Sequence, residues 1–384
     1  MAPQDADRTE IRHARAPSRR VSRSSTVDHR DRIIEIIAAS DLPQCYIALP
    51  DETTFVEAMC HSHIFRPESV FVPVSAGAAS GLFEVEPATG QLTKRCSLAD
   101  DGLWFGCKLG DDGVCYMLFV SKDPRAHAGK VYSCDLTAEA PEARVIVELP
   151  LPYQPNDIAI DRGGGRLLIA AFEQNFDQLS SRGQVLNKLQ LAARRSSKVF
   201  VAPTAGGSPD VFCTGFNALA GAVVCEKDNA LWLSELHNLV RVPLDAPDKW
   251  ARVSPFRPEL LADHMEVDGD ELLFPFYRVH TKTETASCLF CLASCLWKKS
   301  RPAAVTPIDA AAERSAEPGD LFEDACWGRY NVKTKAFTAT RVDIRNTNFN
   351  GHCTHMEKVG DEYIFVNYLK KELLVVGTAR STSS

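Results

Sequence analysis

Five of the ten histidines lie where strand-like segments begin, a place where side chains from separate strands can converge. They are His61, His63, His264, His352 and His355. His61 and His63 share one face of their segment, because alternate residues of a strand point the same way. Imidazole binds transition metals, and it also titrates near neutral pH, which suits a proton donor, a proton acceptor or a hydrogen bond to substrate. Both chemistries stay open at this stage, as does a purely structural use of one or two of the rings.

Side chains suited to binding a substrate open further apolar segments. Asn156 and Asp157 lie together before one such segment, and Asp263 lies at the equivalent place of a later one. We expect these three residues to bind substrate oxygens, or a divalent cation if one is retained, since cations such as Ca²⁺ prefer oxygen ligands. A turn-anchoring role is the structural alternative for Asp157. Trp104 and Tyr277 are expected to form walls of a substrate cavity, with ordinary packing between sheets as the alternative.

These residues recur at one fixed point of a repeat of about fifty residues, and the repeat predicts how they are positioned. Each unit contains a polar opening, apolar strands and a glycine or acidic turn, as in residues 155–161 followed by 166–170. A strand repeat of this length is typical of a β-propeller, whose innermost strands surround a central funnel. Six units fit the chain, so we expect an all-β, six-bladed β-propeller whose first blade begins near Cys45.

The predicted propeller occupies residues 33–378, between a disordered basic tail at 1–32 and a C-terminal tail at 379–384. Two long stretches interrupt its strand pattern, and each predicts a short helical insertion. Residues 175–195 have helical spacing and fall in the third blade. Residues 283–330 interrupt the fifth blade. Their run from Cys288 to Cys295 favours an apolar helix over a zinc site, because a fourth ligand at finger spacing is missing.

The composition restricts the kinds of molecule that the protein is expected to bind. A net charge of -7 argues against broad binding to nucleic acid, which requires a basic surface. No run approaches the roughly 20 apolar residues that span a bilayer, and no apolar signal stretch opens the sequence. The thirteen cysteines are scattered through strand-like segments and fit reduced thiols. We therefore expect a cytoplasmic protein that acts on a small-molecule substrate, has no membrane span and has an oligomeric state that the sequence leaves open.

The order and spacing of the segments resemble a superfamily of six-bladed propellers. It includes the senescence-marker and gluconolactonase group, the paraoxonase-type arylesterases and the strictosidine-synthase-like proteins. The resemblance covers residues 45–378 and is carried by residues 155–158, 215–221, 261–263 and 354–376. In hydrolytic members a divalent cation lies at the funnel floor. It is held by a first-blade glutamate, by asparagines that open the third and fourth blades, and by an aspartate that opens the fifth.

The resemblance implies a partial cation site. Asn156 and Asp263 match cation ligands of the family, and Asp157 matches a ligand of the second cation in the arylesterases. We therefore expect no required cofactor, with Ca²⁺ or another divalent metal as the alternative.

Other positions depart from the family pattern. The fourth-blade asparagine falls on Ala220, and His264 stands where a further asparagine is usual. The first-blade glutamate falls near Cys60 or His61, and Glu52 and Glu57 come too early in the sequence unless the strand shifts. The catalytic histidines of the arylesterases and the catalytic glutamate of strictosidine synthase also have no counterpart at the matching positions.

The sequence favours one function and leaves two alternatives. The favoured function is a biosynthetic enzyme that binds an apolar, oxygenated substrate in the funnel and promotes acid-assisted dehydration and cyclisation. Fungal hetero-Diels–Alderase propellers, which resemble this superfamily in fold, catalyse such closures. In that case His264 and either His352 or His355 donate protons. The alternatives are a divalent-metal-dependent lactonase or arylesterase and a non-catalytic, ligand-binding propeller.

Overall fold

The structure is a computed structural model. It describes residues 12–13, 27–28, 33–34, 36–38, 44–98, 102–121, 123, 127–175, 194–235, 238–253, 260–278, 324–343, 353–367 and 371–377. The tails and the two helical insertions that the sequence predicts lie largely outside these ranges. Within them, the helices are three short 3-10 turns, η1 (Gly77–Ala79), η2 (Glu226–Asp228) and η3 (Pro247–Lys249). Among the described residues, no helix has the length and apolar character required to cross a bilayer.

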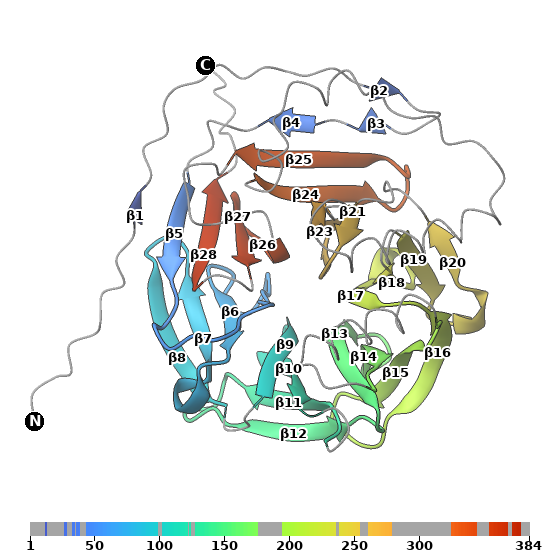
Figure 1. Ribbon diagram of the computed structural model, residues 1–384, viewed down its shortest axis with the longest axis horizontal. Coiled ribbons are helices and arrows are strands. Elements are labelled where there is room, and N and C mark those ends of the chain that lie inside the picture. The colour runs from blue at the N-terminus through green and yellow to red at the C-terminus, as the bar shows by residue number, and fades with distance from the viewer. Residues whose placement is uncertain are drawn as a thin grey trace, which may run out of the picture.

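Six β-sheets surround a central axis (Figure 1), which confirms the six-bladed propeller expected from the sequence. Blade one contains β6 (Val70–Val74), β7 (Gly81–Glu86) and β8 (Gln91–Ser97). Blade two contains β9 (Gly102–Leu109), β10 (Val114–Ser121), β11 (Lys130–Asp135) and β12 (Ala143–Glu148). Blade three contains β13 (Tyr153–Asp161), β14 (Arg166–Glu173), β15 (Ser197–Pro203) and β16 (Asp210–Phe216). In blade one, residues 55–60 form the innermost segment. Isolated β-bridges join Phe55 to Ser75 and Cys60 to Phe71. Neighbouring strands within each of these blades are antiparallel.

Blade four contains β17 (Leu219–Cys225), β18 (Ala230–Glu235), β19 (Asn238–Pro243) and β20 (Ala251–Val253). Blade five contains β21 (Leu260–Ala262), β22 (Glu266–Asp268), β23 (Glu271–Arg278), β24 (Asp324–Asn331) and β25 (Phe337–Asp343). Blade six contains β26 (Cys353–Val359), β27 (Glu362–Asn367) and β28 (Glu372–Gly377). The short strands before residue 39 are β1 (Arg12–His13), β2 (Val27–Asp28), β3 (Ile33–Ile34) and β4 (Ile36–Ala38). β24 begins at Asp324, so the interruption of blade five ends earlier than residue 330, the boundary expected from the sequence.

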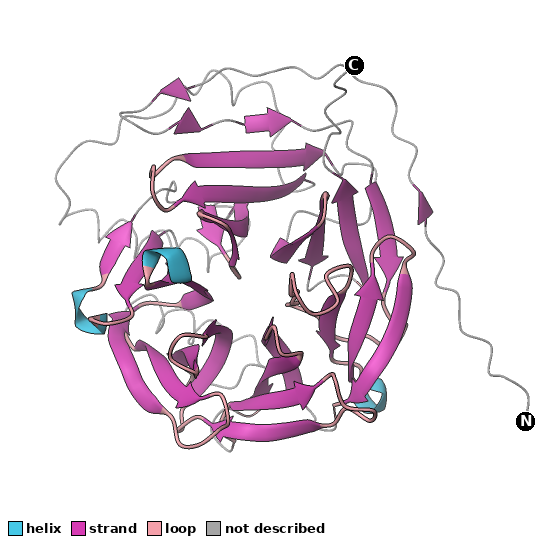
Figure 2. Cartoon of the chain, turned by 180° about the vertical axis from the view of Figure 1, so that it is seen from behind, coloured by secondary structure: helices cyan, strands magenta, loops and turns pink. Residues whose placement is uncertain are grey.

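The last blade is completed by a strand from the first part of the chain. β5 (Gln44–Ala48) pairs antiparallel with β28, with Ile47 opposite Leu373 and Cys45 opposite Val375. The expectation that Cys45 begins the first blade is therefore wrong. The apolar alternation of β5 fits the outer edge of blade six, where Ile47 and Leu373 are buried in the same cluster as strands of blade one. Two segments far apart in sequence thus close the ring (Figure 2).

Apolar side chains fill the spaces between adjacent sheets. Trp104 of β9 is fully buried there, with its ring edge-to-face against Phe119 at 5.3 Å and against Tyr132 at 4.9 Å between centroids. Trp104 also belongs to a buried cluster with Phe71 and Leu82 of blade one, so it packs between blades, which is the alternative to a cavity wall. Tyr277 lies in β23 opposite Leu261, and its side chain lies outside the described part of the structure. This packing fixes the blades around the axis and so fixes the site.

Candidate functional site

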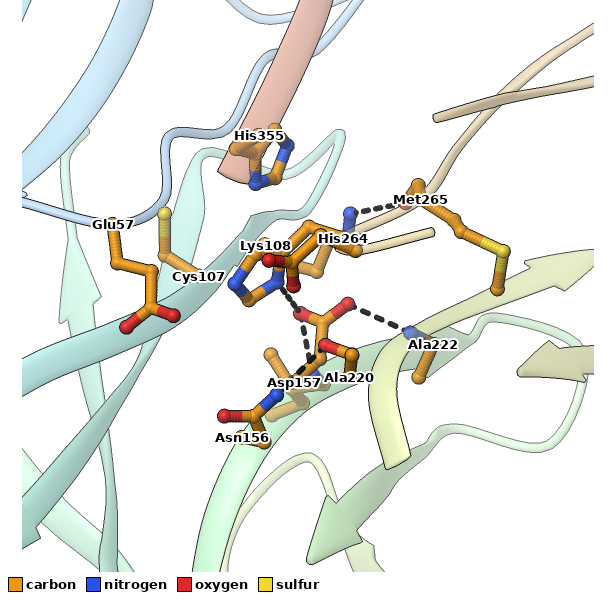
Figure 3. Close-up of polar contacts among 12 residues, drawn as sticks. Glu57, Cys107, Lys108, Asn156, Asp157, Ala220, Ala222, His264, Met265 and His355 are labelled. Atoms are coloured by element: carbon orange, nitrogen blue, oxygen red, sulfur yellow. Dashed lines mark hydrogen bonds and ion pairs between the residues drawn. The ribbon is translucent and has the colours of Figure 1, made fainter. Parts of the chain in front are cut away.

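Side chains from five of the six blades meet at the axis (Figure 3). They are Glu57 from blade one, Lys108 from β9, Asp157 from β13, His264 from the break between β21 and β22, and His355 from β26. Their convergence confirms that the repeated polar openings face one another across the axis. The site is therefore assembled from residues that are distant in sequence.

A backbone irregularity at one level of the inner strands directs these side chains inward. In β13, β17 and β26 the pairing register shifts at Asn156, Ala220 and Thr354, respectively, and blade five breaks between β21 and β22. An extra residue in one strand bends the backbone and re-aims side chains. The side-chain amide of Asn156 donates a hydrogen bond to the carbonyl oxygen of Ala220 at 2.9 Å. The main-chain N–H of His264 donates a hydrogen bond to the carbonyl oxygen of Thr354 at 3.2 Å.

Asp157 and His264 form a fully buried ion pair, with His264 Nδ1 3.2 Å from Asp157 Oδ1. The carboxylate also accepts hydrogen bonds from the main-chain N–H of Ile158 at 2.9 Å and of Ala222 at 2.7 Å. Burial alone would lower the pKa of His264, but the charge and hydrogen bond of Asp157, together with the charges of Asp263 and Glu57, outweigh it and raise the pKa to about 9. His264 is therefore an imidazolium at neutral pH, and its Nε2 has no hydrogen-bond partner among the described residues.

Two more carboxyl groups lie beside this pair. Glu57, Asp263 and His264 each place a ligand atom within 4.8 Å of the others. Burial raises the pKa of Glu57 to about 8 and that of Asp263 to about 7, with mutual repulsion among the carboxylates adding to the rise and the charge of His264 opposing it. Together with Asp157, three carboxyl groups thus surround one imidazolium. The surplus of negative charge favours the uptake of protons or of a cation.

A second cluster lies further along the inner strands. His355 Nε2 is 3.5 Å from Oε1 of Glu266 and 3.5 Å from Oε1 of Glu357. The ammonium group of Lys108 forms an ion pair with Glu266 and donates to the carbonyl oxygen of Met265 at 3.0 Å. Burial, the charge of Lys108 and the charge of His264 hold the pKa of His355 well below its usual range, and burial raises that of Glu357 to about 8. His355 is therefore a neutral imidazole and a weak base.

A funnel of about 340 Å³ opens where the inner strands end. Lys108, Glu266 and Glu357 lie on its lining. His61 and His63 line it as well, with ring centroids 4.8 Å apart, and His61 Nε2 lies 2.9 Å from the carbonyl oxygen of Pro67. The structure thus places this histidine pair on the wall of the funnel and apart from His264.

The structure brings together five of the residues expected at the site: Asn156, Asp157, Asp263, His264 and His355. His352 lies outside the described residues.

Sequence reasoning missed Glu57 and, in the second cluster, the residues Lys108, Glu266 and Glu357. Glu57 was judged too early because the innermost segment of blade one makes only isolated bridges, so the strand pattern gives it no clear register. The second cluster had a readable signal, since His-Met-Glu occurs at residues 264–266 and again at 355–357, and in both copies Gly-Asp-Glu follows after two further residues. Residues two apart share a strand face, so each histidine predicts a glutamate beside it.

Comparison of the sequence with protein-family models and with curated proteins finds no match. Solved structures with a similar fold include an oligogalacturonate lyase in complex with manganese, with a TM-score of 0.54 and 12% identity over 89% of this chain and 95% of that chain. A gluconolactonase from Xanthomonas campestris has a TM-score of 0.51 and 10% identity over 96% of this chain and 100% of that chain. At such identities the likeness concerns the fold, and it confirms the expected resemblance to propellers of the gluconolactonase group.

Proposed function

We propose that this protein is an enzyme that hydrolyses a small ester or lactone with the help of a divalent cation held by Glu57, Asn156 and Asp263. The observation that carries the proposal is the position of Glu57. Its carboxylate lies within 4.8 Å of the ligand atoms of Asp263 and His264, although the sequence placed it outside the site. The hydrolase therefore takes precedence over the cyclase that the sequence favours.

The residues at the axis fit a hard cation. Glu57 Oε2 is buried and has no hydrogen-bond partner among the described residues. The side-chain amide N–H of Asn156 is occupied by Ala220, which turns the amide oxygen toward the side of Glu57 (Figure 3). Carboxylate and amide oxygens are the ligands that Ca²⁺ prefers. Ala220 adds no side-chain oxygen, so we expect weaker binding than a complete ligand set would give.

The side chains around this set suit acyl transfer. A bound divalent cation polarises a carbonyl oxygen and favours the ionisation of water. Asp157 holds the His264 ring in one orientation and keeps it protonated, while no residue in the described ranges is hydrogen-bonded to His264 Nε2. His264 can therefore give its proton to the leaving alkoxide as a general acid, a contribution of about 10²–10⁴-fold in rate. The similar folds of a gluconolactonase and of a lyase in complex with manganese support this choice.

The test starts from protein freed of metal with EDTA and assayed against a panel of lactones and aryl esters. Activity should vanish in EDTA and return with Ca²⁺ or Mn²⁺. Glu57→Gln and Asp263→Asn should each abolish the recovery, whereas Glu52→Gln, an exposed change five residues before Glu57, should leave it intact. Hydrolysis that survives EDTA, or variants that recover fully, would overturn the proposal.

Acid-assisted dehydration and cyclisation is the second candidate, favoured by the same carboxyl groups without a cation. With pKa values of about 8 and about 7, Glu57 and Asp263 are carboxylic acids close to neutral pH, and an acid beside His264 can protonate a departing hydroxyl group. Metal content separates the two candidates. A protein that is purified without metal and turns over a benzylic-type alcohol in EDTA supports cyclisation, while a stoichiometric cation required for turnover supports hydrolysis.

A further inference from the structure

We propose that Glu266, His355 and Glu357 form a second metal site, for a first-row divalent ion such as Zn²⁺ or Mn²⁺, at the floor of the axial funnel. Their ligand atoms lie within 4.8 Å of one another. His355 and Glu357 come from the same face of β26, and Glu266 begins β22 of the neighbouring blade. This site is separate from the set of Glu57, Asn156 and Asp263.

The imidazole of His355 is the strongest indication of a missing ligand. The side chain is fully buried, and neither ring nitrogen has a hydrogen-bond partner among the described residues. Its Nε2 lies 3.5 Å from one oxygen of Glu266 and 3.5 Å from one oxygen of Glu357, which is longer than a hydrogen bond of this type. Glu357 Oε1 also lacks a partner in the described part of the chain. Buried polar atoms are rarely left unpaired, and a cation between these atoms would satisfy them together.

The donor set distinguishes this site from the first. Glu57, Asn156 and Asp263 offer oxygen atoms, which favour Ca²⁺. His355 adds an imidazole nitrogen to two carboxylates, and this mixture of ligands suits Zn²⁺ or Mn²⁺ better than Ca²⁺. The two sites should therefore be separable by the choice of metal.

The funnel gives the metal a route to the site. Glu266 and Glu357 lie on the lining of the 340 Å³ funnel, so an ion can arrive from solvent without opening the propeller. Ion pairs surround the mouth, including Arg162 with Asp111 at 3.0 Å. The funnel is also large enough for water molecules to complete the coordination of a bound ion.

Lys108 is a competing cation and provides the sharpest control. Its ammonium group pairs with Glu266, and a metal ion must displace it from that carboxylate. The ammonium keeps a second partner, the carbonyl oxygen of Met265 at 3.0 Å, so its displacement does not leave it unpaired. Removal of this positive charge should therefore strengthen metal binding, a result opposite to that of removing a structural lysine.

The experiment uses the full chain, freed of metal and then saturated with Ca²⁺ to occupy the first site. Zn²⁺ is titrated by calorimetry, and Co²⁺ by visible absorption as a probe of nitrogen and oxygen coordination. We expect one Zn²⁺ per chain, a loss of affinity of more than about 10-fold in His355→Gln and in Glu357→Gln, and tighter binding in Lys108→Met. His63→Ala, a change in the pair of His61 and His63 on the funnel wall, should bind Zn²⁺ with the same affinity as the unsubstituted protein.

Thermal unfolding of each variant without metal shows whether the variant is folded. If His355→Gln does not fold, Glu357→Gln alone tests the loss of Zn²⁺ affinity. Equal Zn²⁺ affinity in the unchanged protein, Glu357→Gln and Lys108→Met would overturn the proposal. Loss of binding in His63→Ala with retention in Glu357→Gln would do the same, because it would assign the metal to the funnel wall.

Discussion

The imidazole rings of His264 and His355 stack with their centroids 5.1 Å apart and their planes 20° from parallel. The two rings nevertheless differ in charge, because Asp157 contacts His264, whereas burial and the positive charge of Lys108 lower the pKa of His355. A protonated ring thus lies against a neutral one. The stack also connects the two clusters along the axis, so a change in one cluster alters the electric field in the other.

Substitution of Asp157 by asparagine should destabilise the protein strongly. The change removes the charge that balances a fully buried imidazolium, and loss of one partner of a buried ion pair costs about 3–5 kcal/mol. Urea unfolding measures the loss. Glu142→Gln is the matched control, because the pair of Arg144 with Glu142 is largely exposed, and it should change the unfolding midpoint little. Similar midpoints for both variants would show that the buried pair contributes no more than a surface pair.

The metal-free protein should lose stability as the pH rises from 6.5 to about 9. The folded state raises the pKa of His264 from 6.5 to about 9, so its stabilising proton is fully bound below 6.5 and is lost on approach to 9. Glu57 and Asp263, with raised pKa values of about 8 and about 7, act in the same direction because their ionised forms are disfavoured by burial. Urea midpoints in EDTA across this range measure the trend.

His264→Gln is the variant for this pH series. It removes the imidazolium and should make the decline between pH 8 and 9 shallower, since Asp263 is already mostly ionised there and only Glu57 of the two carboxyl groups still titrates. Added Ca²⁺ should stabilise the unchanged protein more at pH 8 than at pH 6, because protons compete for the same carboxylates. A stability that increases with pH in EDTA would contradict the assigned protonation states.

Gly221 of β17 should tolerate no side chain. A Cβ atom there would lie 2.4 Å from the carbonyl oxygen of Asp263 and 3.0 Å from Cα of His264. Gly221→Ala should therefore cost about 1–3 kcal/mol and displace the residues of blade five that form the site. Gly163→Ala is the control, since the nearest atom to its Cβ is 3.7 Å away in an exposed turn. Urea unfolding measures the loss of stability, and Ca²⁺ affinity measures the displacement of the site residues. An unchanged Ca²⁺ affinity in Gly221→Ala would contradict the predicted displacement.

The contact of β5 with β28 should stabilise the whole ring. Ile47 is almost fully buried opposite Leu373, and Ile47→Ala should cost about 2–5 kcal/mol in the free energy of unfolding. Val145→Ala in β12 is the control, because Val145 is 42% exposed. Limited proteolysis should cut the Ile47→Ala protein faster than the control. Equal rates would mean that the ring holds without this strand.

The sequence predicts the propeller well because each blade repeats the same local pattern of opening, strand and turn. It also predicts the positions of Asn156, Asp157 and Asp263, since these residues lie within β13 or directly after β21, and both strands are readable as apolar segments. The sequence does not predict Glu57, because its segment is joined to blade one by isolated bridges and lacks the regular pairing that gives a strand its periodicity.

The partners of the site residues depend on contacts between blades, and these have no local signal. The contact of Asp157 with His264 joins blades three and five, and that of Lys108 with Glu266 joins blades two and five. β5 was assigned to the wrong blade for the same reason, because its partner lies near the other end of the sequence.

The pairing of β5 with β28 also sets an order of events during synthesis. A ribosome releases β5 early and β28 late, so the edge of β5 that pairs with β28 stays unpaired until nearly all of the remaining strands have been translated. During that interval its open edge can pair with another nascent chain. A chain that stops before β28 leaves the circle open, and we expect such products to aggregate or to be degraded.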